Sequence, residues 1–273
     1  RRFPICIIGP NTLAVMNRGL DGDPVTDILV NMERWRWMPR DLGKTYVFVN
    51  IPAFTVAIRR DGTTAYEGRV IVGKPTNPTP VFSDEIEHLV VNPYWNVPYS
   101  IASKEMLSSI RKNPDGYFST RGYEAVYKGR VVNPSSIDWS PAALRNVRIR
   151  QKPGDSNALG HIKFMFPNEH AVYLHDTPSR SLFAKPVRAF SHGCVRVDDP
   201  LEFADALLAE EAHWNAAQIK KLIGGSERYL SLEHHIPVHL AYFTEWVDAD
   251  GTLVHYSDIY GHDRRLAKLL KAD

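Results

Sequence analysis

The change of pattern at Lys44 constrains the fold of this chain more than any other feature of the sequence. Apolar and β-branched residues fill 46–49 and 54–58, and an Asp-Gly pair at 61–62 leads into a similar stretch at 63–72. Such stretches predict β-strands, and the Asp-Gly pair is typical of a hairpin turn. Three prolines in 73–80 end the last strand, because proline cannot donate to a sheet ladder. A β-rich domain is therefore expected to begin near residue 41.

The first 40 residues show helical spacing instead. Residues 10–17 predict a short helix, and Asp23 is placed to cap a second helix whose first position is Pro24. Apolar residues then recur at helical spacing up to Trp35. Trp35 and Trp37 would face different ways on that helix, so we expect packing rather than a platform for stacking sugars.

Residues 83–158 have a different texture and predict an inserted subdomain, because the stretch is too long for an ordinary loop. A helix is expected over 103–112, among turns rich in Asn, Pro, Gly and Tyr. Such an insertion is either a lid over a site or an extra packing layer. Its aromatic residues either line a groove under the lid or pack within the subdomain. They are Tyr94, Trp95, Tyr99, Tyr117 and Tyr123.

The remaining chain alternates short strands and helices. Strands are expected at 164–166, 171–174 and 195–197, followed by a helix that Asp198 or Asp199 caps. The spacing at 238–246 predicts a strand that ends at a hairpin turn. The Glu-His-His run at 233–235 is interpreted as an exposed strand start rather than a set of ligands.

Composition excludes several classes of protein. Lys+Arg 33 against Asp+Glu 31 leaves a net charge of +2, so no strong field would recruit nucleic acid or an anionic membrane. The longest mostly apolar stretch, 47–58, is too short for a membrane span. Two cysteines, Cys6 and Cys194, exclude a disulfide scaffold and a multi-cysteine zinc fold. The chain begins Arg-Arg-Phe with no signal-peptide pattern, so we expect a processed or truncated fragment.

The segment from Ser191 to Arg196 carries the ingredients of an activated thiol. Cys194 follows Gly193, and a basic residue lies two positions to either side, His192 and Arg196. Only the thiolate is a good nucleophile, and a nearby cation or base lowers its pKa. A lone cysteine beside glycine is also a common buried packing residue.

A second histidine favours the chemical interpretation. In strand alternation Tyr173 and His175 share a face, so a phenol and an imidazole can point into one pocket. A Cys–His pair is the minimum unit for covalent acyl transfer, in which the base takes the thiol proton and then protonates the leaving amine.

His175, a spacer of fifteen residues, and then Ser-His-Gly-Cys-Val-Arg at 191–196 resemble the signature of L,D-transpeptidases with the YkuD-type catalytic domain. The segment at 73–80 resembles that family's strand-to-loop segment. The sequence at 92–98 and the long insertion resemble its larger, lid-bearing YcbB-like branch. The stretches at 31–37 and 8–13 resemble that branch's first helix and the tail of a peptidoglycan-binding module.

The resemblance covers about residues 8–262 and implies an architecture. The fold would be α+β, with a mostly β catalytic core of the YkuD β-sandwich type, an inserted lid and flanking helices. Residues 1–40 would be the helical remnant of a peptidoglycan-binding module. Residues 41–273 would be the catalytic domain, with 83–158 as its inserted lid subdomain.

The resemblance also implies cell-wall chemistry. Cys194 would attack the third residue of a tetrapeptide stem and release D-alanine, and an amine would then take the acyl group to form a 3→3 cross-link. His175 would be the base, and the Gly193 and Cys194 amides with the Tyr173 hydroxyl would bind the oxyanion. Residues expected to shape the substrate pocket are Ser191, His192, Arg196 and Trp95. Carbapenems and other β-lactams would acylate the thiol, the location would be the periplasm, and no cofactor is implied.

Several alternatives stay open on the sequence. Water or a D-amino acid as acceptor would make the enzyme an L,D-carboxypeptidase or an exchange enzyme, and a dead site would leave a wall-binding protein. A metal site at His161, His175, His192 and Cys194 lacks any metal-binding spacing. A papain-like hydrolase lacks the residues typical around its cysteine. A Cys6–Cys194 bridge would block the nucleophile, so two free thiols are expected, of which only Cys194 is reactive.

Overall fold

The computed structural model describes residues 23–270, which form two compact units. The larger unit comprises residues 42–49 and 54–240, and the smaller one contains the described residues of 1–41, 50–53 and 241–273. The predicted helix at 10–17 and Cys6 lie outside the described residues. No helix in residues 23–270 is long and apolar enough to cross a membrane.

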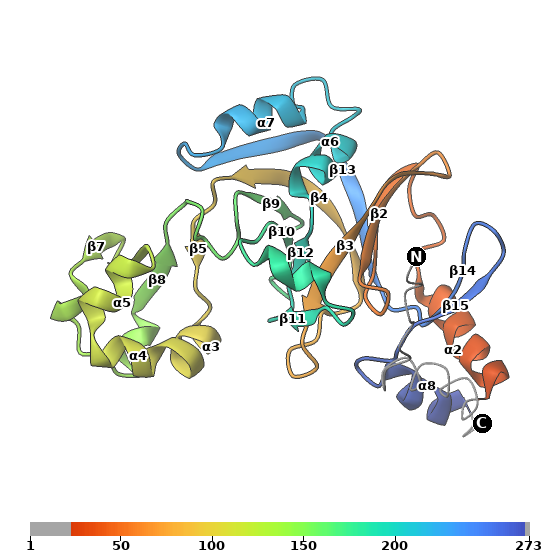
Figure 1. The fold of residues 1–273 in the computed structure, drawn as a ribbon, viewed down its shortest axis with the longest axis horizontal. Coiled ribbons are helices and arrows are strands. Elements are labelled where there is room, and N and C mark those ends of the chain that lie inside the picture. Colours follow the sequence, from red (N-terminus) through yellow and green to blue (C-terminus); the bar gives the residue numbers. More distant parts are fainter. Residues whose placement is uncertain (1–22, 271–273) are drawn as a thin grey trace, which may run out of the picture. The chain divides into compact units, whose positions relative to one another are not determined.

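A nine-stranded sheet dominates the larger unit, with its strands in the order β11-β3-β12-β10-β9-β4-β13-β1-β2 (Figure 1). Because β2 also pairs with β3, the sheet closes on itself. This confirms the prediction of a mostly β catalytic core. The strands are β1 (Thr45–Asn50), β2 (Thr55–Arg60), β3 (Thr63–Gly73), β4 (Phe82–Val91), β9 (Ile162–Met165), β10 (Leu174–His175), β11 (Ala189–Ser191), β12 (Val195–Val197) and β13 (Arg228–Ala241).

Two strand predictions are wrong in extent. The strand expected at 171–174 is reduced to β10, because the Asn168 side chain bonds the carbonyls of Phe166 and Val172 and the amide of His170, and so folds this segment into a turn. The strand expected to reach residue 246 ends at Ala241. Just beyond it, the Asn50 side chain hydrogen-bonds both the amide and the carbonyl of Phe243. These are the backbone groups that would otherwise pair with a neighbouring strand.

One face of the sheet is apolar and covered by a helix. Leu174 pairs with Phe164 on one side and with Val195 on the other, and all three are fully buried. Phe203 of α6 (Pro200–Leu207) packs against Phe164 with ring centroids 4.8 Å apart. Helix α6 begins as predicted, with the Asp199 carboxylate accepting from an amide of its first turn. A second helix, α7 (Ala216–Leu222), follows it.

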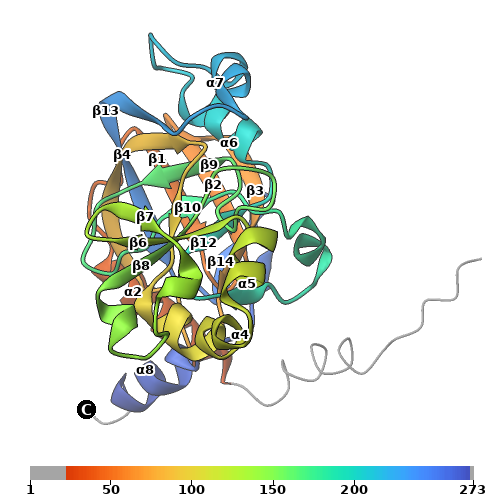
Figure 2. The same ribbon diagram turned by 90° about the vertical axis from the view of Figure 1, so that its left-hand side faces the viewer.

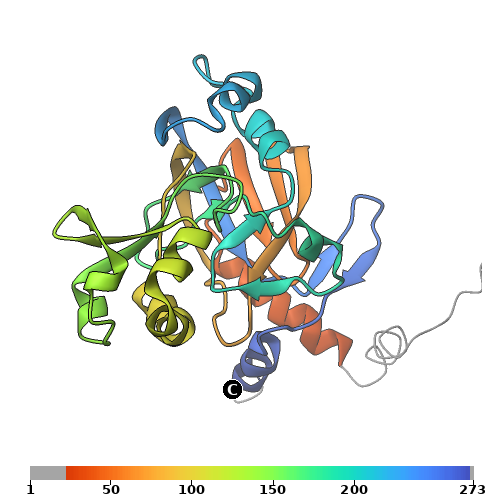
Figure 3. The same ribbon diagram turned by 60° about the vertical axis from the view of Figure 1, so that its left-hand side comes forward.

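The inserted segment folds around an apolar cluster of its own. It stands apart from the nine-stranded sheet in Figures 1 and 3 and faces the viewer in Figure 2. Its buried residues include Ile110, Phe118 and Ile149. The predicted helix at 103–112 is part of a helical run from residue 99, with a π-helical stretch, η1 (Ala102–Met106), inside it. Its other elements are β5 (Trp95–Asn96), α3 (Tyr99–Ile101), α4 (Leu107–Lys112), α5 (Pro114–Thr120), β6 (Tyr123–Tyr127), β7 (Arg130–Val132) and β8 (Val147–Gln151).

The smaller unit contains α2 (Pro24–Trp37), the hairpin β14 (Glu245–Val247) with β15 (Leu253–His255), and α8 (His262–Leu270). Helix α2 begins as predicted, because the Asp23 side chain accepts from the Val25 amide. Its Trp35 stacks on Phe243 with centroids 4.4 Å apart, although it is partly exposed. The packing expected for Trp37 is wrong, because that side chain is exposed.

Candidate active site

The loop from Ser191 to Cys194 connects β11 to β12 and has an unusual backbone. Gly193 has a φ of +120°, a conformation that favours glycine. The buried Ser191 side chain holds the loop from inside, because its Oγ accepts from the Gly193 amide (3.1 Å) and donates to the Cys194 carbonyl (2.5 Å). Ser191, which was expected to shape the substrate pocket, is thus buried and bonds the backbone of the loop.

A second loop supports the first. The Thr79 hydroxyl accepts from the Gly73 amide and donates to the Gly193 carbonyl, both at 2.8 Å. A Cβ at Gly73 would lie 2.2 Å from the Asn77 carbonyl oxygen, so only glycine allows this close approach. The sequence motif at 73–80 contains Thr79 but did not predict a role for it. The Thr79 hydroxyl joins the two loops.

A row of basic side chains crosses the face of the sheet opposite α6. His175 of β10 is in register with Lys163 of β9 on one side and with Arg196 of β12 on the other. Side chains of paired residues project from the same face, so the imidazole lies between two cations. Lys163 was not identified from the sequence. The alternation of Lys163 and Met165 with buried residues in β9 was a signal that could have identified it.

The Cys194 thiol lies next to this row and beside Tyr173, and each of these two groups shifts the pKa of the other. The Val195 amide, which follows the cysteine, donates to the Tyr173 carbonyl at 3.1 Å. Burial raises the pKa of the thiol, although Tyr173 and the charges of Lys163 and Arg196 oppose that rise. Burial, together with the nearby sulfur, raises the pKa of Tyr173, so its hydroxyl stays protonated and can donate. The resting pair is a neutral thiol and a phenol donor.

The Ala171 carbonyl also faces the sulfur, at 3.9 Å. Ala171 has a φ of +52°, which is rare for a residue with a side chain. The Asn168 side chain holds this turn, accepting from the Val172 amide at 3.2 Å. A strained backbone at this position is stabilised by the surrounding hydrogen bonds.

His175 is oriented by a backbone carbonyl. Its Nδ1 lies 2.5 Å from the Asp176 carbonyl oxygen, which can only accept, so Nδ1 carries the proton. The backbone of Leu159 also lies close enough to the ring to affect its pKa. Burial, followed by the charge of Arg196, lowers the pKa of His175 to about 3. The imidazole is thus neutral at ordinary pH, which leaves it able to accept a proton, although the lowered pKa makes it a weaker base. The rings of Tyr173 and His175 lie edge to face with centroids 5.6 Å apart.

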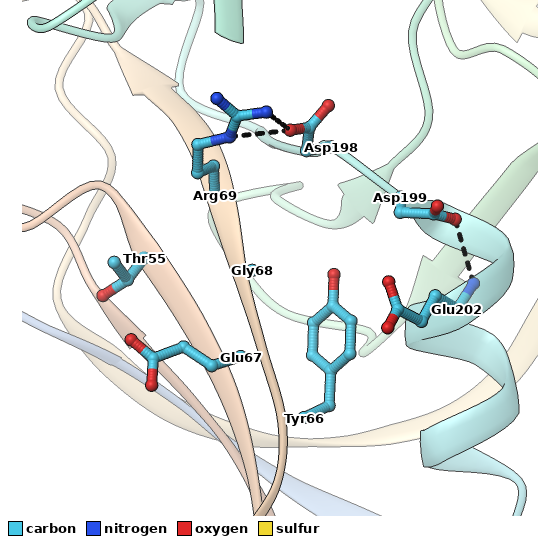
Figure 4. Close-up of a pocket in the computed structure, with 8 residues that line it drawn as sticks. All are labelled: Thr55, Tyr66, Glu67, Gly68, Arg69, Asp198, Asp199 and Glu202. Atoms are coloured by element: carbon cyan, nitrogen blue, oxygen red, sulfur yellow. Dashed lines mark hydrogen bonds and ion pairs between the residues drawn. The ribbon is translucent and has the colours of Figure 1, made fainter. Parts of the chain in front are cut away.

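A chain of ion pairs reaches the segment behind His175. Arg180 binds Asp176 at 3.2 Å and Asp198 at 3.9 Å, and Asp198 binds the Arg69 Nε at 2.8 Å. Figure 4 shows the Arg69 end of this chain, beside a cavity of about 470 Å³ that Tyr66 and four carboxylates line. That cavity contains neither Cys194 nor His175, so it lies outside the reacting centre.

Two further predicted residues relate the site to the inserted segment. His192 is exposed, and its Nε2 lies 2.7 Å from a carboxylate oxygen of Glu105 in η1 and 3.4 Å from the Lys74 Nζ. Trp95 packs against the apolar cluster of the insertion and lies 6.3 Å from the Tyr123 ring. The structure therefore brings together Ser191, Gly193, Cys194, Tyr173, His175 and Arg196, and it places His192 at the rim and Trp95 in the insertion.

Arg196 is half-buried, and its Nε has no hydrogen-bond partner among residues 23–270. Within the same residues, no group of three or more His, Cys, Asp or Glu side chains is arranged to hold a metal ion. The groups that the site presents are a thiol, a neutral imidazole, a phenol and two cations. This set is suited to covalent acyl transfer.

Comparison with known proteins identifies the class. A family model described as the L,D-transpeptidase catalytic domain, YkuD, matches residues 44–255. The chain belongs to this family of L,D-transpeptidase catalytic domains.

A Haemophilus influenzae protein described as a "Putative L,D-transpeptidase" is 40% identical over 224 residues, which are 81% of this chain. The chain spans 45% of the length of that relative. Among solved structures, an L,D-transpeptidase from Mycobacterium smegmatis is 15% identical, with a TM-score of 0.36 and coverage of 72% of this chain and 58% of that one. L,D-transpeptidase 3 from Mycobacterium tuberculosis, in complex with a faropenem-derived adduct, is 13% identical, with a TM-score of 0.37 and coverage of 72% and 60%.

Proposed function

We propose that the chain transfers the acyl group of a peptidoglycan stem peptide through a thioester on Cys194. The donor would be a tetrapeptide stem, cleaved after its third residue with release of D-alanine. The acceptor would be an amine of another stem, which gives a 3→3 cross-link. The observation that carries this proposal is the Cys194 thiol beside Tyr173 and Lys163, next to the face of the sheet on which Lys163 is in register with a neutral His175.

In the first half-reaction, the His175 Nε2 takes the thiol proton while the sulfur attacks the carbonyl carbon of the donor. Because the pKa of the thiol is raised and that of His175 is lowered, the resting pair is neutral, and charge develops only as the reaction proceeds. Lys163 and Arg196 then stabilise the negative charge on sulfur and oxygen. The imidazolium finally returns its proton to the departing amine of D-alanine.

The tetrahedral intermediate needs donors for its oxyanion. We assign this role to the Cys194 and Gly193 amides and the Tyr173 hydroxyl, with the Gly193 amide exchanging its bond to Ser191 for one to the oxyanion. The unpartnered Nε of Arg196 supports a further role for this residue, which is to bind an anionic group of the donor stem.

The same thiol would open the strained amide of a β-lactam, carbapenems included, and remain as a covalent adduct. Synthesis of cell-wall cross-links that help to maintain cell shape would place the whole protein in the periplasm. The inserted subdomain would begin after β4 and not at residue 83, because residues 82–91 form a strand of the nine-stranded sheet, and it would end near 158. It would act as a lid, because Glu105 contacts His192 beside the nucleophile. His192 would then shape the pocket, and Trp95 would contact substrate under the lid.

The test is to incubate the chain with purified tetrapeptide muropeptides and identify the products by mass spectrometry. We expect release of D-alanine and a cross-linked dimer, and neither product with Cys194→Ala. A product formed with water alone would establish a carboxypeptidase, and incorporation of added D-amino acids would establish exchange. Binding to sacculi without any product would leave a wall-binding protein and overturn the proposal.

A further inference from the structure

A cavity of about 240 Å³ opens between the inserted subdomain and the nine-stranded sheet, within the larger unit. Among the residues that line it are Tyr94, Arg148 and Arg150 of the subdomain and Lys163, Glu227 and Tyr229 of the sheet side. Ligand pockets for whole small molecules are typically larger, about 300–1,000 Å³. This cavity therefore suits one end of a peptide.

Strand β8 supplies the two arginines by strict alternation. Val147, Ile149 and Gln151 are buried, with the first two inside the apolar cluster of the subdomain, while Arg148 and Arg150 project from the other face. Arg150 is held in place, because it pairs with Glu124 at 2.8 Å and lies over the Tyr94 ring at 4.3 Å. Arg148 is exposed and forms no ion pair within the described part of the chain.

The opposite wall continues the catalytic row. Lys163 is in register with Val90 of β4 and with His175 of β10, and Val90 in turn pairs with Tyr229 of β13. The Lys163 Nζ lies 4.2 Å from the centre of the Tyr173 ring, and Tyr173 lies close enough to Cys194 to affect the pKa of its thiol. Lys163 thus lines the cavity and is also the neighbour of His175 on the adjacent strand, so the cavity and His175 share one face of the sheet.

The charges of the lining define what the cavity attracts. Arg148, Arg150 and Lys163 carry three positive charges against the two negative charges of Glu227, in the lining, and of Glu124, which pairs with Arg150. Burial lowers the pKa of Lys163, while Glu227, and Cys194 when it is ionised, act to raise it. Arginine binds carboxylates with directional, charge-assisted hydrogen bonds. An anionic group is thus favoured near the arginines.

We propose that this cavity is the acceptor subsite, and that Arg148 and Arg150 bind a carboxylate on the same carbon as the attacking amine. The assignment rests on the proposed acyl transfer. It names the acceptor class as an α-amino carboxylate, at the end of a stem side chain or as a free D-amino acid. The neighbouring cations disfavour the ammonium form of that amine and so favour its neutral, nucleophilic form.

The transfer from the thioester to the amine needs no further reactant, because His175 and Cys194 account for the proton. The neutral amine attacks the thioester carbonyl, a C–N bond forms, and the C–S bond breaks. His175 takes the proton lost by the amine and returns it to the Cys194 sulfur, which regenerates the thiol. The carboxylate held by the arginines remains unchanged and fixes where the amine enters, on the His175 side of the thioester.

The first experiment compares two matched acceptors, D-methionine and D-methioninamide, which differ only in the carboxylate. With a tetrapeptide donor, we expect the wild-type chain to prefer D-methionine by roughly tenfold or more in the ratio of amide product to hydrolysed product. Arg148→Gln should remove most of that preference. Arg130→Gln, an exposed arginine of the same subdomain outside the cavity, is the matched control and should keep it.

Equal use of the two acceptors by the wild-type chain, or an unchanged preference in Arg148→Gln, would overturn the subsite. A slower release of D-alanine at an unchanged product ratio would assign the cavity to the donor and would also overturn it.

A second measurement does not depend on turnover. The Cys194→Ala chain, labelled with ¹⁵N-arginine, is titrated with D-methionine and D-methioninamide while the arginine Nε signals are followed by NMR. We expect the carboxylate alone to shift two signals, one of which disappears from the spectrum in Arg148→Gln. Shifts without any cross-linked product would keep the carboxylate subsite and reject the proposed function, whereas product without shifts would do the reverse.

Discussion

The nine-stranded sheet and the inserted subdomain are stabilised in different ways. The catalytic face of the sheet combines residues that are distant in sequence, since Lys163, His175 and Arg196 lie on three adjacent strands and Thr79 supports the nucleophile loop. The subdomain instead builds its core within residues 95–149, and it meets the catalytic loop through polar contacts such as Glu105–His192. Chemistry is thus expected to reside in the sheet, and the subdomain is expected to modulate it.

The largest effect should come from the base in the sheet. His175→Ala removes the proton acceptor, so the acylation rate by a carbapenem should fall by about 10²–10⁴-fold. Stopped-flow absorbance and intact mass would follow the rate. His235→Ala, an exposed histidine of the same sheet, is the control. A loss below tenfold would show that the chemistry does not depend on this row.

A smaller loss should follow when the support between the two loops is removed. Thr79→Val keeps the shape of the side chain but leaves the buried Gly73 amide and Gly193 carbonyl without their shared hydroxyl. Such loss typically costs roughly 1–3 kcal/mol. Urea unfolding should show that decrease, and acylation should slow about tenfold. Thr76→Val, exposed in the same loop, should match the wild type, and an equal effect there would refute the assignment.

The contact between the subdomain and the catalytic loop should matter less. Glu105→Gln removes one charge of an exposed pair, and such pairs contribute about 0–1 kcal/mol. We expect at most about a fivefold rise in KM for a tetrapeptide donor, together with faster hydrogen exchange in residues 99–112. Asp115→Asn, exposed in α5, is the control. A fall of tenfold or more in kcat would mean that Glu105 takes part in the chemical step. It would contradict the view that the chemistry resides in the sheet and the subdomain only modulates it.

The smallest effect is expected from pH. Because burial and Arg196 lower the pKa of His175 to about 3, and because burial raises that of Cys194, both groups stay neutral between pH 5 and 8. The acylation rate should be flat across that range and should rise only where the thiol ionises. A decline with a midpoint near 6.5 would mean that His175 titrates as an exposed imidazole.

The pH dependence of the free energy of unfolding should also reflect the protonation of His175. The unfolded chain binds a proton on His175 near pH 6.5, whereas the folded chain does so only near pH 3. The contribution of the neutral imidazole is therefore complete above pH 6.5, and it is lost as the pH falls toward 3. The free energy of unfolding should decrease over this window in the wild type and less steeply in His175→Gln. Parallel curves would show that other groups cause the acid sensitivity.

The sequence predicted the residues near the nucleophile better than the contacts that hold them. Local signals identified the strands around 46–72, the cap at Asp199 and the segment 191–196, because each depends on neighbours in the chain. Lys163 could not be placed beside His175, since strand register comes from tertiary pairing. The turn at Asn168 overrode the strand spacing before Leu174 through side-chain bonds to the backbone.

The most direct test of the account is to locate the covalent adduct of a carbapenem. After incubation of the wild-type chain, intact mass spectrometry should show one adduct per chain, and peptide mapping should assign it to Cys194 and not to Cys6, the other thiol of the sequence. Cys194→Ala should show no adduct under the same conditions. An adduct that persists in Cys194→Ala, or that maps to another residue, would contradict the central claim that this thiol is the nucleophile.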